Sequence, residues 1–464
     1  MLKVECKISN VGSIYKPDMH LPPTPRTSST LQLLRWIFTP MSYMDECASA
    51  YSDIYSLNVR PDYAAVFISN PDALQTILTS DTKELSAPGE LNNIFTPILG
   101  TQSVITASGK QHLRKRQLVM PALHGERMRA YADIINQVTS EVISTLQIGA
   151  RFSIRNVTQT ITLKIIMQAV FGLYDSPPAR ELEQVLKNIL DSTSSPLSLA
   201  AATFPIFGKV LGSLNPARDF DTLLQQADKI IYEEIQERRS SLDFEKRIDI
   251  LSLLMSARDE DGQAMTDVEL RDELMTLLTA GHETTATALA WAVYFIYKNE
   301  NVKTKLLSEL NSLGDNPDSN TIFKLPYLTA VCNETLRIYP VGLLTFPRRV
   351  EKPISLCGYN LEPGALVYGS IYNTHRRKDL YPNPEQFKPE RFLERQYSAY
   401  EFLPFGGGAR RCIGLAFAQF EMKLVLARML TSVQLELVTK TKVNPKRRGL
   451  VSAPDRPIYI NRLL

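Results

Sequence analysis

The stretch FLPFGGGARRCIGLAFAQFEMKLVLARML, residues 402–430, carries the strongest structural signal in the chain. Three successive glycines, Gly406 to Gly408, permit a tight loop whose backbone can approach a neighbour closely. After Gly414 the apolar residues recur with a helical period, which predicts an amphipathic helix to about Leu430. The loop therefore presents Cys412 just ahead of a helix.

The surroundings of Cys412 in the sequence favour its thiolate form. Backbone N–H groups at a helix start stabilise an anion, and the neighbouring Arg410 and Arg411 do the same. A thiolate can be a metal ligand, a nucleophile or a redox centre, but no resolving cysteine and no histidine base lies nearby in the sequence. We therefore favour a metal ligand, and the plain alternative is a cysteine packed at a helix start.

The composition excludes several classes of protein. The chain of 464 residues is 44% hydrophobic and 22% charged, unlike a disordered, collagen-like or membrane-bundle protein. Its net charge of +3 is too small to indicate a polyanion-binding protein, so we expect no nucleic-acid partner. Five scattered cysteines fit neither a disulfide framework nor a zinc cluster. The length suggests about three domains, but no repeat or Gly/Ser linker divides the chain, so we expect a single domain over residues 21–464.

The N-terminal residues carry no targeting signal. Lys3, Glu5 and Lys7 stand where a secretory apolar core would lie, and the chain has no apolar run of the length that spans a membrane. We expect a cytoplasmic protein without a transmembrane anchor, with residues 1–20 as a disordered lead-in. Residues 194–215 are nearly uncharged and rich in apolar side chains. They predict either core or a surface that admits a lipophilic ligand or touches a membrane.

A long helix is predicted over residues 267–297. A T-x-x-E capping box at residues 266–269 marks its start, and without an interrupting proline the helix spans about 45 Å. Leucines and alanines on every face predict burial, yet the string AGHET lies at the centre, residues 280–284. Buried polar groups cost free energy unless they have partners. Either they bond locally, or the helix opens beside a ligand where Glu283 and Thr284 handle protons.

A second helix is predicted over residues 326–338. Glu334 and Arg337 stand three residues apart, so they share a face and can pair. Alone this is a weak signal, because an exposed pair stabilises a helix by only about 0.3 to 0.5 kcal/mol. The proline-rich segment NPEQFKPERF, residues 383–392, adds Arg391. An arginine there that reaches Glu334 would tie an irregular loop to the helix.

These motifs together resemble those of a known family. Residues 405–414 match F-x-x-G-x-R-x-C-x-G, the haem-thiolate signature of the cytochrome P-450 superfamily, at every specified position. The AGHET, E-x-x-R and P-E-R-F strings occur in the family's order and at compatible spacings. The resemblance covers the chain from about Leu21 to its end. The string PALHGERMRAY, residues 121–131, is most similar to cyanobacterial members.

The resemblance implies a mainly α fold with a small β-rich subdomain, enclosing one haem b between the long central helix and the helix after the cysteine loop. Cys412 would be the axial iron ligand, and such a thiolate favours O–O bond cleavage. Thr284 would donate a hydrogen bond at the oxygen site, where Glu283 helps to relay protons. The other residues implied to border the haem or its oxygen are Phe405, Gly406, Gly414, Ala280 and Gly281. Glu334, Arg337 and Arg391 would form a structural triad.

Haem propionates need cations, and the resemblance implies which residues supply them. The candidates are Arg410, one of Arg348 and Arg349, and the pair His112 and Arg116. The last two stand four residues apart and share a helix face. Many relatives carry tryptophan where His112 stands, and a solvated basic face is the plain alternative for this helix.

The implied activity is that of a monooxygenase. Two electrons and two protons reduce O2, one oxygen atom enters a C–H bond of the substrate, and the other leaves as water. The chain has no flavin or iron–sulfur signature, so a ferredoxin or flavodoxin with its NAD(P)H reductase would supply the electrons. We expect a basic patch for this acidic partner, made of Arg376, Arg377, Lys378, Arg410, Arg411 and Lys423.

The implied substrate is lipophilic, such as a fatty acid or a terpenoid. Four mostly apolar segments would contact it: residues 92–99, residues 204–207, the helix near Ala280, and residues 342–346. Two other classes stay open. A haem-thiolate isomerase or peroxygenase would act on oxidised lipids without redox partners, although such enzymes commonly depart from the acid–alcohol pair. A non-enzymatic haem-binding protein would need the cysteine alone.

Overall fold

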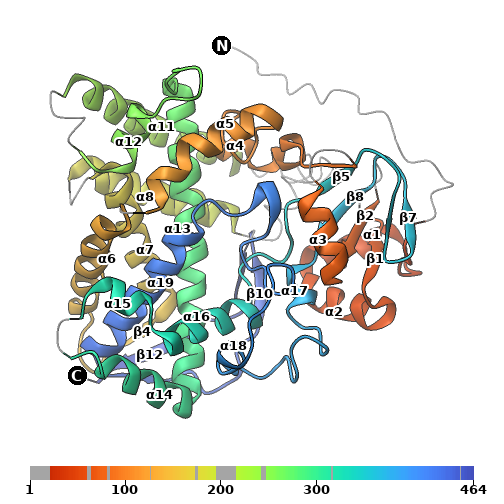
Figure 1. The fold of residues 1–464 in the computed structure, drawn as a ribbon. Coiled ribbons are helices and arrows are strands. Elements are labelled where there is room, and N and C mark those ends of the chain that lie inside the picture. Colours follow the sequence, from red (N-terminus) through yellow and green to blue (C-terminus); the bar gives the residue numbers. More distant parts are fainter. Residues whose placement is uncertain are drawn as a thin grey trace. The chain divides into compact units, whose positions relative to one another are not determined.

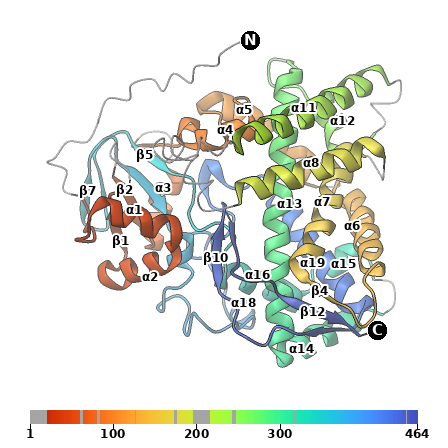
Figure 2. The ribbon, with the colours of Figure 1, turned by 180° about the vertical axis from the view of Figure 1, so that it is seen from behind.

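The computed structural model describes residues 21–59, 64–80, 84–125, 127–172, 176–194, 216–241, 247–314, 317–449 and 451–463. Three predictions fall outside these residues: the lead-in over residues 1–20, the apolar stretch after Ser194 and the substrate contacts at residues 204–207. The described part is mostly helical with small sheets (Figures 1 and 2), so the predicted fold class is confirmed.

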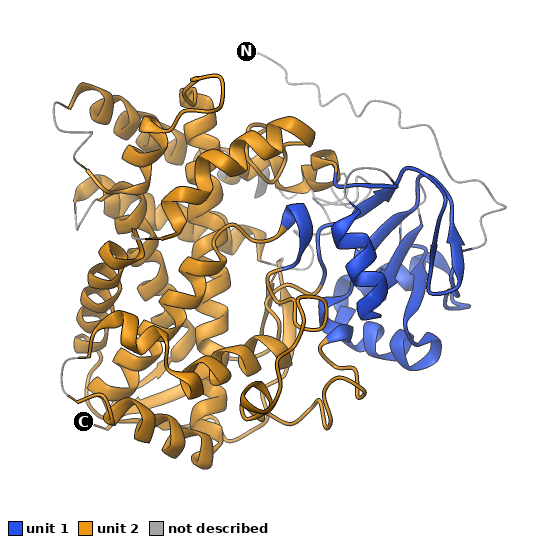
Figure 3. Ribbon diagram, viewed as in Figure 1, with its two compact units in different colours: residues 1–87, 344–374, 406–410 blue, residues 88–343, 375–405, 411–464 orange. Residues whose placement is uncertain are grey.

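The chain divides into two compact units, each built from three separate segments (Figure 3). Unit 1 contains residues 1–87, 344–374 and 406–410, and unit 2 contains residues 88–343, 375–405 and 411–464. Neither unit is a continuous stretch of chain. The expected single domain over residues 21–464 stays a prediction.

Unit 1 is built around a five-stranded sheet in the order β1-β2-β8-β5-β3, in which only β2 and β8 pair in parallel. The hairpin β6-β7 is separate. Its strands are β1 (Ile54–Leu57), β2 (Ala65–Ile68), β3 (Leu85–Ser86), β5 (Arg348–Val350), β6 (Ile354–Leu356), β7 (Tyr359–Leu361) and β8 (Leu366–Gly369). Its helices are α1 (Ser29–Phe38), α2 (Pro40–Tyr51), α3 (Pro71–Thr79), α17 (Ile371–Thr374) and the 3-10 turn η5 (Gly408–Arg410).

Unit 2 is the helical part. Its helices are α4 (Thr96–Leu99), α5 (Gly109–Val119), α6 (Arg127–Ser144), α7 (Ile154–Phe171), α8 (Pro177–Thr193), α11 (Pro216–Ser240), α12 (Ile250–Ser256), α13 (Asp267–Lys298), α14 (Glu300–Asn311), α15 (Ser319–Phe323), α16 (Pro326–Ile338), α18 (Arg391–Glu394) and α19 (Leu415–Ser432), with 3-10 turns η1 (Gly89–Phe95) and η2 (Met120–Leu123). Its strands are β4 (Arg151–Ser153), β9 (Leu435–Leu437), β10 (Pro445–Arg448), β11 (Val451–Pro454) and β12 (Tyr459–Arg462). They form the sheet β4-β12-β9 and the hairpin β10-β11.

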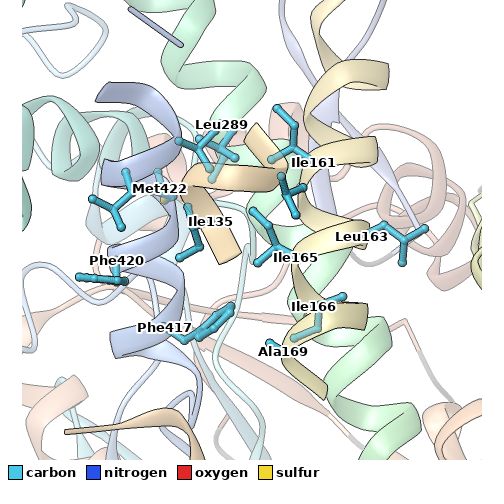
Figure 4. Packing of buried hydrophobic residues seen from close by; sticks show 14 of the residues in the cluster. Ile135, Ile161, Leu163, Ile165, Ile166, Ala169, Leu289, Phe417, Phe420 and Met422 are labelled. Atoms are coloured by element: carbon cyan, nitrogen blue, oxygen red, sulfur yellow. The ribbon is translucent and has the colours of Figure 1, made fainter. Parts of the chain in front are cut away.

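Helix α13 runs through the middle of unit 2, and the predicted central helix is confirmed. The Thr266 hydroxyl accepts from the Glu269 N–H, and the Glu269 carboxylate accepts from the Thr266 N–H, which completes the capping box. Figures 1 and 2 show α7 and α19 running beside α13, and both helices pack against it. Figure 4 shows part of this core, where Ile135 of α6, Ile165 of α7 and Phe417 of α19 lie together.

Candidate functional site

Helix α13 is buried along most of its length but is less buried at its centre, where Thr279 and Glu283 are also half-buried. Leu277, Gly281 and Thr284 are half-buried and Ala280 is exposed, whereas residues 270–276 and 285–296 are buried. These four residues are three or four positions apart, so they form one stripe on the helix. We call them the α13 stripe. It offers small and apolar surface around a single hydroxyl.

The two polar residues predicted at this point face different surroundings. The Thr284 hydroxyl donates to the Ala280 carbonyl oxygen one turn earlier, at 2.6 Å, so it stays on the stripe. Glu283 instead contacts α7. Its Oε1 accepts from Arg155 and its Oε2 accepts from the Gln159 amide at 2.9 Å. The acid and the alcohol are therefore neighbours in sequence with separate partners.

His282 lies inside the helix packing and is not part of the stripe. It is buried, and its Nδ1 lies 2.9 Å from the Thr162 hydroxyl of α7. Burial, together with the smaller effects of the nearby charges of Arg155 and Lys187, lowers the pKa of His282 to about 3. The neutral ring acts as a packing element between α7 and α13.

The cysteine loop holds Cys412 two residues before the Gly414 that caps α19. The Cys412 N–H donates to the Phe405 carbonyl oxygen at 3.0 Å, which closes the loop. The side chain is exposed, but the protein crowds the sulfur enough that burial raises the pKa of the Cys412 thiol. A hydrogen bond from the Gly414 backbone and the charges of Arg116 and Arg411 lower the pKa, but less strongly. The helix start and the arginines therefore favour the thiolate, as expected, but burial outweighs them while no metal is bound. A metal ion that binds the sulfur would displace its proton.

Helix α5 brings its predicted cation close to this loop. The Arg116 Nη1 donates to the Arg411 carbonyl oxygen at 2.6 Å, and burial lowers the pKa of Arg116 although the nearby Cys412 raises it. His112 lies one turn earlier on the same helix and is 5% exposed. The structure thus brings Arg116 to the residue next to Cys412.

Two further predicted cations lie in unit 1. Arg410 is buried, and its guanidinium donates to the Ala87 carbonyl oxygen at 2.6 and 3.2 Å. Arg348 of β5 is also buried, and it donates to the carbonyl oxygens of Phe346 at 3.0 Å and Gly407 at 3.3 Å. Both arginines therefore lie at the Gly406–Arg410 segment of the loop. Its first glycine, Gly406, has φ +66°, a conformation that favours glycine.

The predicted ion-pair helix meets its second arginine in unit 2. Glu334 is fully buried and accepts from Arg337 at 2.7 and 2.8 Å and from Arg391 at 3.1 Å. Arg337 also donates to the carbonyl oxygens of His375 and Pro384, at 2.8 and 2.9 Å. One carboxylate thus joins α16 to the irregular chain that precedes the cysteine loop.

The predicted basic patch is smaller than the sequence suggests. Lys423 is buried, and its ammonium donates to the Phe323 carbonyl oxygen at 2.7 Å, while Arg410 is buried as described. Arg376 pairs with Glu385, and Arg377 pairs with Asp379 at 2.8 Å. Lys378 and Arg411 are the exposed cations of the predicted set. Linear sequence could not reveal this, because burial and pairing depend on the folded neighbours.

Comparisons with known proteins cover almost the whole chain. The family model described as cytochrome P-450 matches residues 21–462. The chain belongs to the cytochrome P-450 family. It is similar to cytochrome P-450 135B1 of Mycobacterium tuberculosis, with 32% identity over 95% of this chain and 90% of that protein. Cytochrome P-450 135A1 of the same species is 32% identical over 95% of this chain and 94% of that protein. Both names are provisional.

The same fold occurs in a solved structure of retinoic acid-bound cyanobacterial CYP120A1. The TM-score is 0.80 at 22% identity, over 96% of this chain and 99% of that chain. This likeness shows the cytochrome P-450 fold. None of the described helices has both the length and the apolar composition needed to cross a membrane.

Membership of the cytochrome P-450 family implies a haem with a cysteine thiolate as its axial ligand, as predicted. The residues present fit this group. The Cys412 side chain is exposed at the start of α19, and thiolate sulfur is a suitable iron ligand. Ala280 is exposed at the centre of an otherwise largely buried helix, where a flat macrocycle could lie, whereas Gly281 faces Ile166 of α7.

Arg155 and Gln159 are the residues near the acid–alcohol pair that sequence reasoning missed. They lie 128 and 124 positions before Glu283, and no motif surrounds them. The one local signal is a cation in the first turn of α7, where the positive end of a helix disfavours it. That signal indicates a nearby anion without saying which one.

Proposed function

We propose that this cytochrome P-450 monooxygenase oxidises a lipophilic substrate with electrons from a separate redox protein. The α13 stripe supports this proposal most directly. Its exposed and half-buried surface is apolar except for the Thr284 hydroxyl. Binding sites for lipophilic molecules have this composition, with apolar walls and few polar groups.

The bound haem would supply the one-electron and O2 chemistry. Cys412 would hold the iron through its sulfur. The Thr284 hydroxyl donates its proton in a hydrogen bond to the Ala280 carbonyl oxygen. We assign this hydroxyl the role of a hydrogen-bond donor at the oxygen site. Glu283 is the acid next to it in sequence, and we assign it the supply of protons to this position.

We assign the haem propionates to Arg348, Arg410, Arg116 and His112. Arg348 and Arg410 are both buried and both bond backbone oxygens at the cysteine loop or beside it. Buried guanidinium groups favour bidentate pairing with carboxylates. Of the two neighbours in β5, Arg348 is the better candidate, because its Nη2 reaches the Gly407 carbonyl oxygen at 3.3 Å.

We assign the redox-partner contact to the exposed cations next to Cys412 and in the chain before the loop. Arg411 adjoins Cys412 in sequence, and Lys378 is the second exposed member of the set. An acidic ferredoxin or flavodoxin would be attracted to these charges. Arg376 and Arg377 contribute less, because acids of the same chain pair with them.

The test is a reconstitution with an acidic ferredoxin, its NADPH reductase and a panel of fatty acids, terpenes and retinoic acid. Each compound is first titrated for a shift in the haem spin state. We expect a binder to yield an oxygenated product that carries one atom from isotopically labelled O2. Product formed only with added hydrogen peroxide would instead show a peroxygenase. A rearranged product without label would show an isomerase.

A further inference from the structure

Three side chains between α7 and α13 form a closed ring of hydrogen bonds. The Arg155 Nη2 donates to the Glu283 Oε1, and its Nη1 donates to the Gln159 Oε1 at 3.3 Å. The Gln159 Nε2 donates in turn to the Glu283 Oε2 at 2.9 Å. Each side chain thus contacts the other two, and both oxygens of the carboxylate are engaged toward α7. We call these three residues the acid clamp.

The clamp is largely shielded from solvent. The side chains of Arg155 and Glu283 are 13% and 15% exposed. An ion pair in such surroundings is stronger than an exposed pair, because less water screens it. The Nε of Arg155 is buried without a hydrogen-bond partner among the described residues. The hydrogen bonds of its two Nη atoms to Gln159 and Glu283 therefore hold the guanidinium in place.

Neighbouring contacts fix the two helices at this point. The Thr158 hydroxyl of α7 donates to the Ala286 carbonyl oxygen at 2.9 Å, and the Thr162 hydroxyl donates to the His282 carbonyl oxygen at 3.2 Å. These bonds lie on either side of Glu283 along α13. The direction of the carboxylate is consequently set by rigid elements, whereas a loop would leave it variable.

The position of the clamp matters because Glu283 adjoins Thr284. Consecutive residues of a helix point about 100° apart, so the carboxylate lies beside the α13 stripe and not on it. An acid that supplies protons to Thr284 must stay within reach of that hydroxyl. Without the clamp, the flexible Glu283 side chain would spread over several rotamers.

We propose that Arg155, with the help of Gln159, is a positioning residue that holds the Glu283 carboxylate beside the α13 stripe for proton delivery. This inference rests on the proposed role of Glu283. It goes further in assigning the control of that acid to α7, a helix that the family's motifs do not include.

The first test measures the interaction between Arg155 and Glu283 through protein stability and does not depend on enzyme activity. Thermal unfolding of the haem-loaded protein is compared for Arg155→Met, Glu283→Gln and the double variant. If the pair exists, the two single changes are not additive, and we expect a coupling of about 2 °C in Tm. Lys164→Met removes an exposed cation from the same helix and serves as the matched control, for which additivity with Glu283→Gln is expected. Additive shifts for Arg155→Met would overturn the clamp.

The second test asks whether the clamp acts through Glu283. We expect Arg155→Met to keep haem loading and substrate KM while lowering product formed per NADPH about threefold or more, since positioned acids contribute large rate factors. Arg155→Lys should restore most of the yield. In the Glu283→Gln background, Arg155→Met should have no further effect.

The outcomes separate this inference from the proposed function. If Glu283→Gln leaves the yield unchanged, the proton role of Glu283 fails, whatever the coupling in Tm. If Glu283→Gln lowers the yield but Arg155→Met does not, or lowers it independently, the positioning role fails. A higher yield in Arg155→Met would also contradict it, because Arg155 would then restrain the acid.

Discussion

The Thr284 hydroxyl donates to the carbonyl oxygen of Ala280 at 2.6 Å, on the α13 stripe. Thr284→Ala removes this proton from the stripe without a charge change. We expect haem loading and substrate binding to persist while electrons are diverted to peroxide. The measurement is product and hydrogen peroxide formed per NADPH. Thr284→Ser keeps the hydroxyl and is the control. An unchanged yield in Thr284→Ala would refute the assigned role.

The Glu334 carboxylate accepts hydrogen bonds from two arginines. It is fully buried between Arg337 and Arg391. Removing one partner of a buried ion pair costs about 3 to 5 kcal/mol, because the other charges stay buried. We expect Glu334→Ala to lower Tm strongly and to reduce the fraction of chains that hold haem. Glu394→Ala, at an exposed acid, provides the comparison. A Tm within a degree of the unsubstituted protein would contradict this expectation.

Glu273 predicts a pH dependence of stability. It is completely buried in α13, and no described side chain donates a hydrogen bond to either carboxylate oxygen. Burial raises the pKa of Glu273 most, the charge of Lys115 and a hydrogen bond from the Val104 backbone lower it, and the charges of Asp272 and Glu269 raise it; together they give a pKa of about 8. The folded chain therefore keeps a proton that the unfolded chain releases above its ordinary pKa near 4.5. This difference in pKa between the folded and the unfolded chain adds to the free energy of unfolding at acidic pH. The contribution falls as the pH rises toward 8.

The corresponding experiment is a series of Tm measurements from pH 5 to pH 8 on Glu273→Gln. The amide is neutral throughout, so we expect a flatter profile and a higher Tm at pH 8 than in the unsubstituted protein. The difference at pH 8 has an upper limit of about 5 kcal/mol. Glu237→Gln, at an exposed glutamate, should leave the profile unchanged. Parallel profiles for Glu273→Gln and the unsubstituted protein would show that the group is ionised in the fold.

Arg411 tests the assigned electron-transfer surface. We expect Arg411→Glu to raise the KM for an acidic ferredoxin about tenfold at low ionic strength, with a smaller effect at high salt, because exposed charges act at long range and are screened. Lys440→Glu makes the same charge change at another exposed position. Equal effects of the two variants would mean that net charge and not this surface attracts the partner. The carbon monoxide spectrum of each variant reports whether the Cys412 site is intact.

The sequence predicts the parts of this protein whose signals are local. The capping box at Thr266 fixes the start of α13, and Gly414 fixes the start of α19. Both depend on residues within one helical turn. The family resemblance named Ala280, Gly281 and Thr284 of the α13 stripe, but the surrounding leucines and alanines alone do not show which face of the helix a neighbouring element leaves open. The Arg155 contact was equally inaccessible, since it joins residues 128 positions apart.

The pKa of Cys412 and the burial of Lys423 could not be predicted from neighbouring residues in the sequence. A helix start and two arginines favour a thiolate at Cys412 by rule, yet burial in the folded loop raises the pKa of the thiol. Lys423 follows the cysteine by eleven positions and looks exposed in an amphipathic pattern, but its stem is buried and its ammonium bonds Phe323. Desolvation depends on the complete set of neighbours, which only the fold supplies.

The central claim is that Cys412 holds a haem iron through its sulfur. Its most direct test is the carbon monoxide difference spectrum of the reduced protein, recorded for the unsubstituted chain and for Cys412→His. We predict the thiolate-type band that is typical of the cytochrome P-450 family in the first, and its replacement by a histidine-type band, or loss of haem, in the second. A histidine-type band in the unsubstituted protein, or an unchanged thiolate band in Cys412→His, would contradict the claim.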